Sequence, residues 1–189
     1  MLRFVLKSLL IGCILLLSVL LSLLFKKPKK TEAQLYILGS GGHTREMMQL
    51  LKILKPSDPE FIHAESDQLS KRLLLEMYPI AKFTATPRAR QVKQSYFTAI
   101  FSTIKAFFFA FKYLMRLKPK FLLTNGPGTA FPFIVLCWIL NQLNIFDCKI
   151  VMVESYCRIE KLSLTGKLVR PFCDEFISCW PLLGAKQIE

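Results

Sequence analysis

A glycine-rich turn that ends in a histidine is the segment whose residue types best fit a chemical role. Residues 39–44 read Gly-Ser-Gly-Gly-His-Thr and follow four apolar residues that predict a buried strand. Apolar spacing over residues 47–54 predicts a helix directly behind the turn. This arrangement brings free backbone N–H groups and the positive end of a helix to one point, which suits a phosphate or pyrophosphate. The glycines let the backbone approach a ligand closely, and His43 would place a titratable imidazole beside it.

Two other polar segments follow apolar runs in the same way. Asn125-Gly-Pro-Gly-Thr129 comes after residues 120–124, and Glu154-Ser-Tyr-Cys-Arg158 comes after residues 148–153. Strands that alternate with helices predict an α/β fold with a Rossmann-like parallel sheet and helices on both faces. Ligands of such sheets bind at the carboxyl ends of the strands, where all three segments would lie. We therefore favour a functional site over a purely structural turn at residues 39–43.

Hydrophobic spacing and proline or glycine breaks place the remaining elements. Asp67 is expected to cap the second helix, which ends before Pro79. His63 lies in an expected strand, where a hydrogen-bonded structural histidine is favoured over a catalytic one. A basic loop with Arg88 and Arg90 follows the third strand. The expected strands are 34–38, 61–64, 80–84, 120–124, 148–153 and one within 174–181; the expected helices are 47–54, 69–77, 95–117, 130–143 and a short one after 160.

The N-terminal 25 residues predict a membrane anchor. Residues 8–25 carry no charge, and 18 helical residues span roughly 27 Å, close to the hydrocarbon thickness of a bilayer. A cleaved signal peptide is the alternative, but the segment runs into four lysines instead of small residues. We therefore expect an anchor over 1–25, a basic juxtamembrane linker over 26–33 and one domain over 34–189. The lysines after the span place that domain in the cytosol and the N-terminus on the other side.

The net charge of +13 is concentrated in the middle of the chain. No carboxylate occurs between Glu76 and Asp147, which suits a polyanion or an anionic membrane surface. The anchor and the lack of a nucleic-acid motif exclude nucleic acid as the partner. Residues 95–117 combine many phenylalanines with a narrow basic face, which fits either an interfacial membrane helix or a core helix of a Phe-rich protein. Lys105 in the middle of that segment argues against a second membrane span.

The cysteines and histidines do not indicate a metal site. The chain has six cysteines without a C-x-x-C pair, and neither of its two histidines is spaced with a cysteine as zinc ligands are. We interpret the five cysteines beyond the anchor as buried thiols and expect neither a metal nor a cofactor.

The motifs together resemble those of a known family. Gly39-Ser-Gly-Gly-His-Thr, Asn125-Gly-Pro-Gly-Thr-Ala, the segment from Val153 to Leu168 and the closing Trp180-Pro181 occur in the same order and approximate spacing. This pattern is similar to the membrane-anchor subunits of the eukaryotic UDP-N-acetylglucosamine transferase of the dolichol-linked oligosaccharide pathway. The similarity covers nearly the whole chain. One departure is the short segment of eight residues after Pro181, where family members continue with a hydrophobic tail that docks their partner.

The resemblance implies the acceptor-side half of a split GT-B glycosyltransferase on the cytosolic face of the endoplasmic reticulum. A soluble subunit would bind UDP-GlcNAc, and the heterodimer would transfer GlcNAc to O4 of GlcNAc-pyrophosphoryl-dolichol with inversion and without an essential metal. The chain would be active only with that partner. One Rossmann-like lobe agrees with this expectation, because a two-lobed nucleotide-sugar enzyme needs another.

The sequence suggests roles for individual residues in such a transfer. Inversion needs a base for the attacking hydroxyl, and His43 is the first candidate, followed by Glu154. His43 capping a helix, or Glu154 pairing with Arg158 or Arg45, would be the structural explanations. The expected acceptor and pyrophosphate contacts are Gly39, Ser40, Gly41, Gly42, Thr44, Arg88, Arg90, Asn125, Gly126, Gly128, Thr129 and Arg158. Two other functions stay open, a non-catalytic scaffold for the partner and a bacterial-type subunit acting on an undecaprenyl-linked sugar.

Overall fold

Strands and helices alternate along almost all of the described chain. The computed structural model describes residues 32–88, 96–181 and 186–187, so the expected anchor and most of the basic linker lie outside the described residues. The elements are β1 (Gln34–Ile37), α2 (Gly42–Leu54), β2 (Pro59–Ala64), α3 (Gln68–Met77), β3 (Lys82–Thr86), α4 (Tyr96–Leu117), β4 (Phe121–Thr124), α5 (Ala130–Gln142), β5 (Lys149–Val153), α6 (Leu164–Val169), the 3-10 turn η1 (Arg170–Phe172), β6 (Glu175–Ser178) and β7 (Lys186–Gln187).

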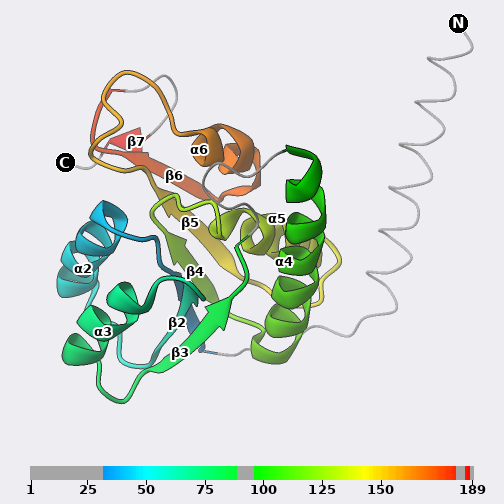
Figure 1. Ribbon diagram of the computed structural model, residues 1–189, viewed down its shortest axis with the longest axis horizontal. Coiled ribbons are helices and arrows are strands. Elements are labelled where there is room, and N and C mark those ends of the chain that lie inside the picture. The colour runs from blue at the N-terminus through cyan, green and yellow to red at the C-terminus, as the bar shows by residue number, and fades with distance from the viewer. Residues whose placement is uncertain (1–31, 89–95, 182–185, 188–189) are drawn as a thin grey trace, which may run out of the picture.

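The strands form one parallel sheet in the order β3-β2-β1-β4-β5-β6-β7 (Figure 1). This confirms the predicted Rossmann-like α/β fold. The strand order reverses at the centre, where β1 lies between β2 and β4. At such a switch point the loops after the two central strands diverge to opposite faces and leave a crevice for a ligand. The loops in question here are residues 38–41 after β1 and residues 125–129 after β4.

Each strand of the centre is buried on both faces, as parallel sheets require. Leu35 and Ile37 of β1 pack with α4 and α5 in one core cluster, whereas Tyr36 packs with α2 and α3 in the other. Figure 1 shows the same division, with α2 and α3 on one side of the sheet and α4, α5 and α6 on the other. The two cores fix both central strands, and with them the loops that leave their carboxyl ends.

Most element boundaries agree with the sequence to within two residues. Asp67 caps α3 as predicted, accepting a hydrogen bond from Ser70 N at 3.2 Å. The third strand was expected to begin at Ile80, but it begins at Lys82 because Ala81 N bonds back to Tyr78 O and leaves Ile80 94% exposed. The two-residue strand β7 was not predicted.

The cysteine interpretation is correct only in part. Cys137 and Cys148 are buried and Cys173 and Cys179 are partly buried, but Cys157 is exposed on the loop after β5. That loop carries no apolar periodicity that would turn the thiol inward.

α4 combines a packed face with an exposed aromatic face. Ala106, Ala110 and Leu114 are buried against the sheet, whereas Phe101, Ile104 and Phe108 are each at least 60% exposed. A hydrogen bond of 2.7 Å from Tyr113 Oη to the buried Glu60 of β2 ties the helix to the sheet. Within the described part of the chain, no helix has the length and apolar character needed to cross a membrane, and this includes α4.

Candidate functional site

A cleft of about 200 Å³ lies at the carboxyl ends of the two central strands. Its walls come from the turn after β1, the ends of β2 and β3, and the turn after β4. The two glycine turns, which the sequence predicted at one edge of the sheet, therefore line one cleft. The lining residues are Leu38, Gly39, Ser40, His43, Ala64, Arg88, Gly126, Pro127, Gly128 and Thr129.

The turn after β1 leaves backbone donors free at the start of α2. Gly41 has a φ of +66°, a conformation that favours glycine, and it precedes the helix without any side-chain cap. The first turn of α2 contains no acidic residue. The uncapped N–H groups and the helix dipole therefore favour an anion at this end of the cleft.

Gly39 permits the close approach of the two turns. A Cβ at this position would lie 2.7 Å from His43 Cβ and 3.0 Å from Pro127 Cβ. Only a residue without a side chain fits between the start of α2 and the turn after β4. The glycine predicted to contact a ligand thus also sets the spacing of the cleft walls.

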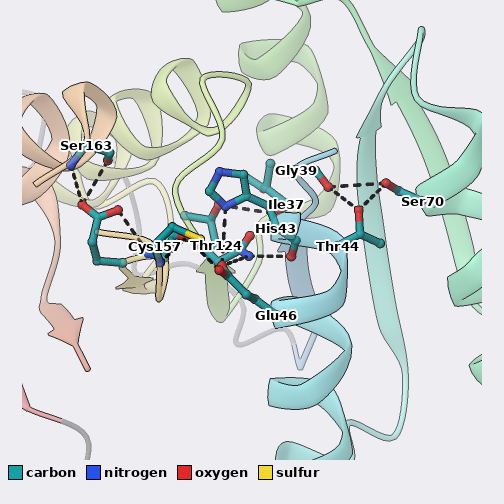
Figure 2. A network of polar contacts seen from close by, with 12 residues as sticks. Ile37, Gly39, His43, Thr44, Glu46, Ser70, Thr124, Cys157 and Ser163 are labelled. Atoms are coloured by element: carbon teal, nitrogen blue, oxygen red, sulfur yellow. Dashed lines mark hydrogen bonds and ion pairs between the residues drawn. The ribbon is translucent and has the colours of Figure 1, made fainter. Parts of the chain in front are cut away.

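Thr44 supports the turn from behind. Its side chain is buried, and its hydroxyl donates to Gly39 O at 2.6 Å (Figure 2). Ser70 of α3 belongs to the same network, since its hydroxyl oxygen lies 2.5 Å from that of Thr44. The Thr44 hydroxyl, which the sequence assigned to ligand contact, is placed where it holds the glycine turn against α3.

Asn125 joins the two turns. Its side chain is 1% exposed, and Nδ2 donates to His43 O at 2.6 Å and to Glu46 Oε2 at 3.3 Å. Gly126 follows with a φ of +92°, and Gly128 is exposed at the cleft. The turn after β4 therefore shapes the cleft through Asn125 and lines it through residues 126–129.

His43 and Glu46 face one another on the first turns of α2. The Nδ1 atom of His43 lies 3.7 Å from Glu46 Oε2, and the two side chains are 33% and 12% exposed. Nδ1 is buried without a hydrogen-bond partner. In Figure 2 the other ring nitrogen points away from Glu46. His43 also lines the cleft, and an imidazole that borders a cleft can in principle accept a proton from a hydroxyl bound there.

Glu154 is buried beneath the loop that follows β5. It is 2% exposed, and its carboxylate accepts hydrogen bonds from Ser155 N at 3.2 Å, Ser163 N at 2.9 Å and Ser163 Oγ at 3.0 Å. Ser163 in turn caps α6 by accepting from Gly166 N at 2.9 Å. The structural role of Glu154 is therefore to close the loop onto α6, and its hydrogen-bond partners are serines rather than Arg158 or Arg45.

Of the remaining residues singled out in the sequence, some line the cleft and others lie elsewhere in the domain. Arg88 lies on the cleft wall, whereas Arg90 is outside the described residues. Arg158 is exposed in a separate depression formed by residues 157–161, away from the cleft lining. His63 is buried with Nδ1 3.0 Å from Ala64 O, as predicted for a structural histidine.

Glu46 and Ser163 were not predicted as residues of the site. Glu46 follows His43 by one helical turn, and that spacing was a signal for a shared face of α2. Ser163 precedes a short helix and is an ordinary N-cap residue. The partners of Glu46 are Asn125 and Ser155, which lie 79 and 109 residues further along the chain. Ser163 bonds to Glu154, nine residues earlier. Only the fold brings these residues together.

Comparison with known proteins places the chain in a family. A family model described as "Oligosaccharide biosynthesis protein Alg14 like" matches residues 34–188. Proteins named "UDP-N-acetylglucosamine transferase subunit ALG14" are similar to the chain, with 36% identity for the mouse protein and 35% for the human protein. In both cases the match covers 84% of this chain and 80% of the relative. The Yarrowia lipolytica protein of that name is 34% identical, with a coverage of 85% and 79%.

Solved structures confirm the fold independently of close sequence similarity. MurG of Acinetobacter baumannii superposes with a TM-score of 0.62 at 15% identity, over 84% of this chain and 44% of MurG. A UDP-N-acetylglucosamine 2-epimerase gives a TM-score of 0.51 at 13% identity, over 79% of this chain and 40% of the epimerase. The chain thus spans less than half the length of these two proteins. The family match over residues 34–188 and the three relatives above 30% identity show that the chain belongs to the Alg14-like family of oligosaccharide biosynthesis proteins.

Proposed function

We propose that this chain is the membrane-anchored, acceptor-binding half of a two-chain UDP-N-acetylglucosamine transferase. A soluble partner holds UDP-GlcNAc, and the heterodimer adds GlcNAc to O4 of GlcNAc-pyrophosphoryl-dolichol at the cytosolic face of the endoplasmic reticulum. The observation that carries the proposal is the meeting of the Gly39–His43 and Gly126–Thr129 turns at the switch point of the sheet. The names of the relatives support the sugar and the subunit role.

The size of the cleft supports a division of the substrates between two chains. Pockets that enclose a ligand of drug size measure roughly 300–1,000 Å³. The cleft of about 200 Å³ suits a phosphate group and part of one sugar, but it is too small to enclose a complete nucleotide sugar. We therefore assign the acceptor to this chain and the donor to a surface that the partner supplies.

The chemistry of the proposed transfer rests on three features of the cleft. The N–H groups at the start of α2 bind the acceptor pyrophosphate, and Arg88 adds positive charge to the lining of the cleft. His43 takes the proton of the O4 hydroxyl while this oxygen attacks C1 of the donor sugar. The bond from C1 to the UDP oxygen breaks with inversion, and UDP leaves with the electron pair. Burial of Glu154 favours His43 over Glu154 as the base.

Membrane attachment has two proposed parts. Residues 1–25 form the anchor, with the N-terminus in the lumen, and the exposed face of α4 lies in the headgroup boundary of the cytosolic leaflet. The support for the second part is the combination of Phe101, Ile104 and Phe108 with Lys105 and Lys112 on a helix without a carboxylate. A cavity of about 780 Å³ between α4 and the end of β3 extends the apolar surface.

The function is tested in the purified heterodimer with a synthetic polyprenyl-pyrophosphoryl-GlcNAc acceptor and labelled UDP-GlcNAc. We expect transfer only when both chains are present, and His43→Ala should lower kcat about 100-fold or more. Full activity of the partner alone on a soluble acceptor would instead make this chain a scaffold. Transfer to undecaprenyl but not dolichyl acceptors would identify the bacterial-type reaction.

The lipid contact of α4 is tested with the full chain in vesicles whose phospholipids carry bromine on the acyl chains. A Phe108→Trp variant should lose part of its tryptophan emission, because bromine quenches indoles in its neighbourhood. Ile53→Trp on α2 is the matched control, since Ile53 is 79% exposed on the other side of the sheet. Equal quenching of the two variants would refute the contact.

A further inference from the structure

Glu46 lies at the junction of three segments that are distant in the sequence. Its Oε1 accepts a hydrogen bond from Ser155 Oγ at 2.7 Å, and its Oε2 accepts one from Asn125 Nδ2 at 3.3 Å. Asn125 Nδ2 also donates to His43 O, so the amide clamps the start of α2. The Glu46 carboxylate is therefore held in one place by the turn after β4 and by the end of β5.

The fixed carboxylate faces the buried edge of the His43 ring. Oε2 is 3.7 Å from Nδ1, and Nδ1 has no hydrogen-bond partner although it is buried. A buried ring nitrogen without a partner is costly, and the nearest group that can satisfy it is this carboxylate. If the distance between Nδ1 and Oε2 shortens slightly, the two atoms form an N–H···O⁻ hydrogen bond. Hydrogen bonds of this kind in enzymes often tighten only when substrate is bound.

We propose that Glu46 is the positioning residue of His43 in the proposed transfer. By accepting from Nδ1–H it fixes the tautomer in which Nε2 carries a lone pair toward the cleft. Nε2 then takes the proton of the acceptor hydroxyl as the new glycosidic bond forms and the bond to UDP breaks. The Glu46 charge stabilises the resulting imidazolium, which later releases its proton to water. This inference rests on the proposed function, because it needs His43 to act as the base.

Other charged and titratable groups surround the pair. Arg88 lines the same cleft as the imidazole. Tyr156 and Cys179 face Glu46 from the segments after β5 and β6. Burial raises the pKa of both groups, and the Glu46 charge adds to each rise. Both groups are therefore uncharged at neutral pH, and Glu46 is the anion that faces the imidazole in the described part of the site.

The test compares Glu46→Gln with the wild-type heterodimer. The amide keeps the size of the side chain and removes its charge, so we expect kcat to fall about 10- to 100-fold, the loss found for residues that orient metal-bound histidines. The KM for the acceptor should change little. Glu46→Asp keeps the charge and should recover part of kcat, and Glu76→Gln, an exposed carboxylate on α3, is the matched control.

A second comparison separates a role through His43 from a merely structural one. In a His43→Ala background, Glu46→Gln should cause no further loss of kcat, because the group that it positions is absent. An equal loss in both backgrounds would overturn the inference. An unchanged kcat in Glu46→Gln would overturn it as well. If His43→Ala itself retained wild-type turnover, the assignment of the base under the proposed function would fail first. Thermal unfolding and retention of the partner verify that each variant is folded.

Discussion

Replacing Glu154 by glutamine distinguishes between the two roles that the sequence allows for this carboxylate. If Glu154 were the general base, losing its charge would lower kcat by about 10²- to 10⁴-fold and leave stability nearly unchanged. If it holds the loop after β5, the same change acts mainly on folding. The structure favours the second outcome, because the carboxylate is 2% exposed and accepts three hydrogen bonds.

The expected loss of stability follows from those three bonds. The glutamine oxygen can keep both contacts with Ser163, but its NH₂ group then faces Ser155 N–H and cannot accept from it. Leaving one buried donor unsatisfied costs about 1–3 kcal/mol in the free energy of unfolding. For a domain of this size each 1 kcal/mol corresponds to about 2–4 °C, so we expect the midpoint of thermal unfolding to fall by roughly 2–12 °C.

The assay measures thermal unfolding by circular dichroism and turnover of the heterodimer well below the transition. Glu160→Gln, on the exposed part of the same loop, controls for the loss of one negative charge. We expect a lower midpoint and near-normal kcat for Glu154→Gln, and no change in either for the control. A 100-fold loss of kcat at an unchanged midpoint would refute the structural role and make Glu154 the base.

Three further predictions concern the cleft walls, the attachment of α4 and the cysteines. Gly39→Ala should lower the unfolding midpoint, because the new Cβ would lie 2.7 Å from His43 Cβ. Gly42→Ala is the control: its Cβ would meet no atom within 4 Å, so the midpoint should stay unchanged. Burial, with a hydrogen bond to Glu60, raises the pKa of Tyr113 to about 12 from an ordinary 10. The folded state thus retains a proton that the unfolded state loses, so Tyr113 should lower stability between pH 10 and 12 by up to about 2–3 kcal/mol. Tyr113→Phe should reduce the slope in urea titrations without removing it, because burial also raises the pKa of Tyr36 to about 12. At pH 8 a thiol reagent should modify Cys157 quickly and Cys173 slowly, because burial raises the pKa of Cys173 to about 12; Cys157→Ser should remove the fast phase.

The sequence predicted the fold and the meeting of two turns because both depend on local patterns. Alternating apolar runs and helical spacing determine the order of elements, and parallel pairing then brings the segments after β1 and β4 to one edge. Gly39 and Gly126 were recognisable for a related reason, since close approach and positive φ have few alternatives to glycine.

The roles of individual polar side chains were harder to predict because they depend on contacts that no local pattern encodes. Thr44 was expected to contact the ligand and Glu154 was the second candidate for the base, yet their bonds go to Gly39 O and to Ser163. Arg158 follows β5 closely in sequence, but its loop turns away from the cleft before the residue is reached. Position at a strand end brings a residue near the site, whereas hydrogen-bond partners decide whether its side chain remains available.

The positions of the cavity beside α4 and of the cleft at His43 suggest how the proposed acceptor is oriented on the domain. The apolar cavity beside α4 includes Glu65 and Pro87, and the cleft includes the adjoining residues Ala64 and Arg88. A hydrogen bond of 3.0 Å from Glu65 N to Thr86 O joins these two segments, so the two hollows are bordered by residues that are neighbours in the chain. Passing from α4 to His43, a molecule would meet apolar side chains, then Arg88 and the uncapped start of α2, and finally the imidazole. A polyprenyl-pyrophosphoryl sugar has matching parts in the same order: a hydrocarbon chain, a negatively charged pyrophosphate and a sugar hydroxyl. In this orientation the lipid end remains at the membrane, and the O4 hydroxyl points toward the open side of the cleft, where a donor held by another chain can reach it.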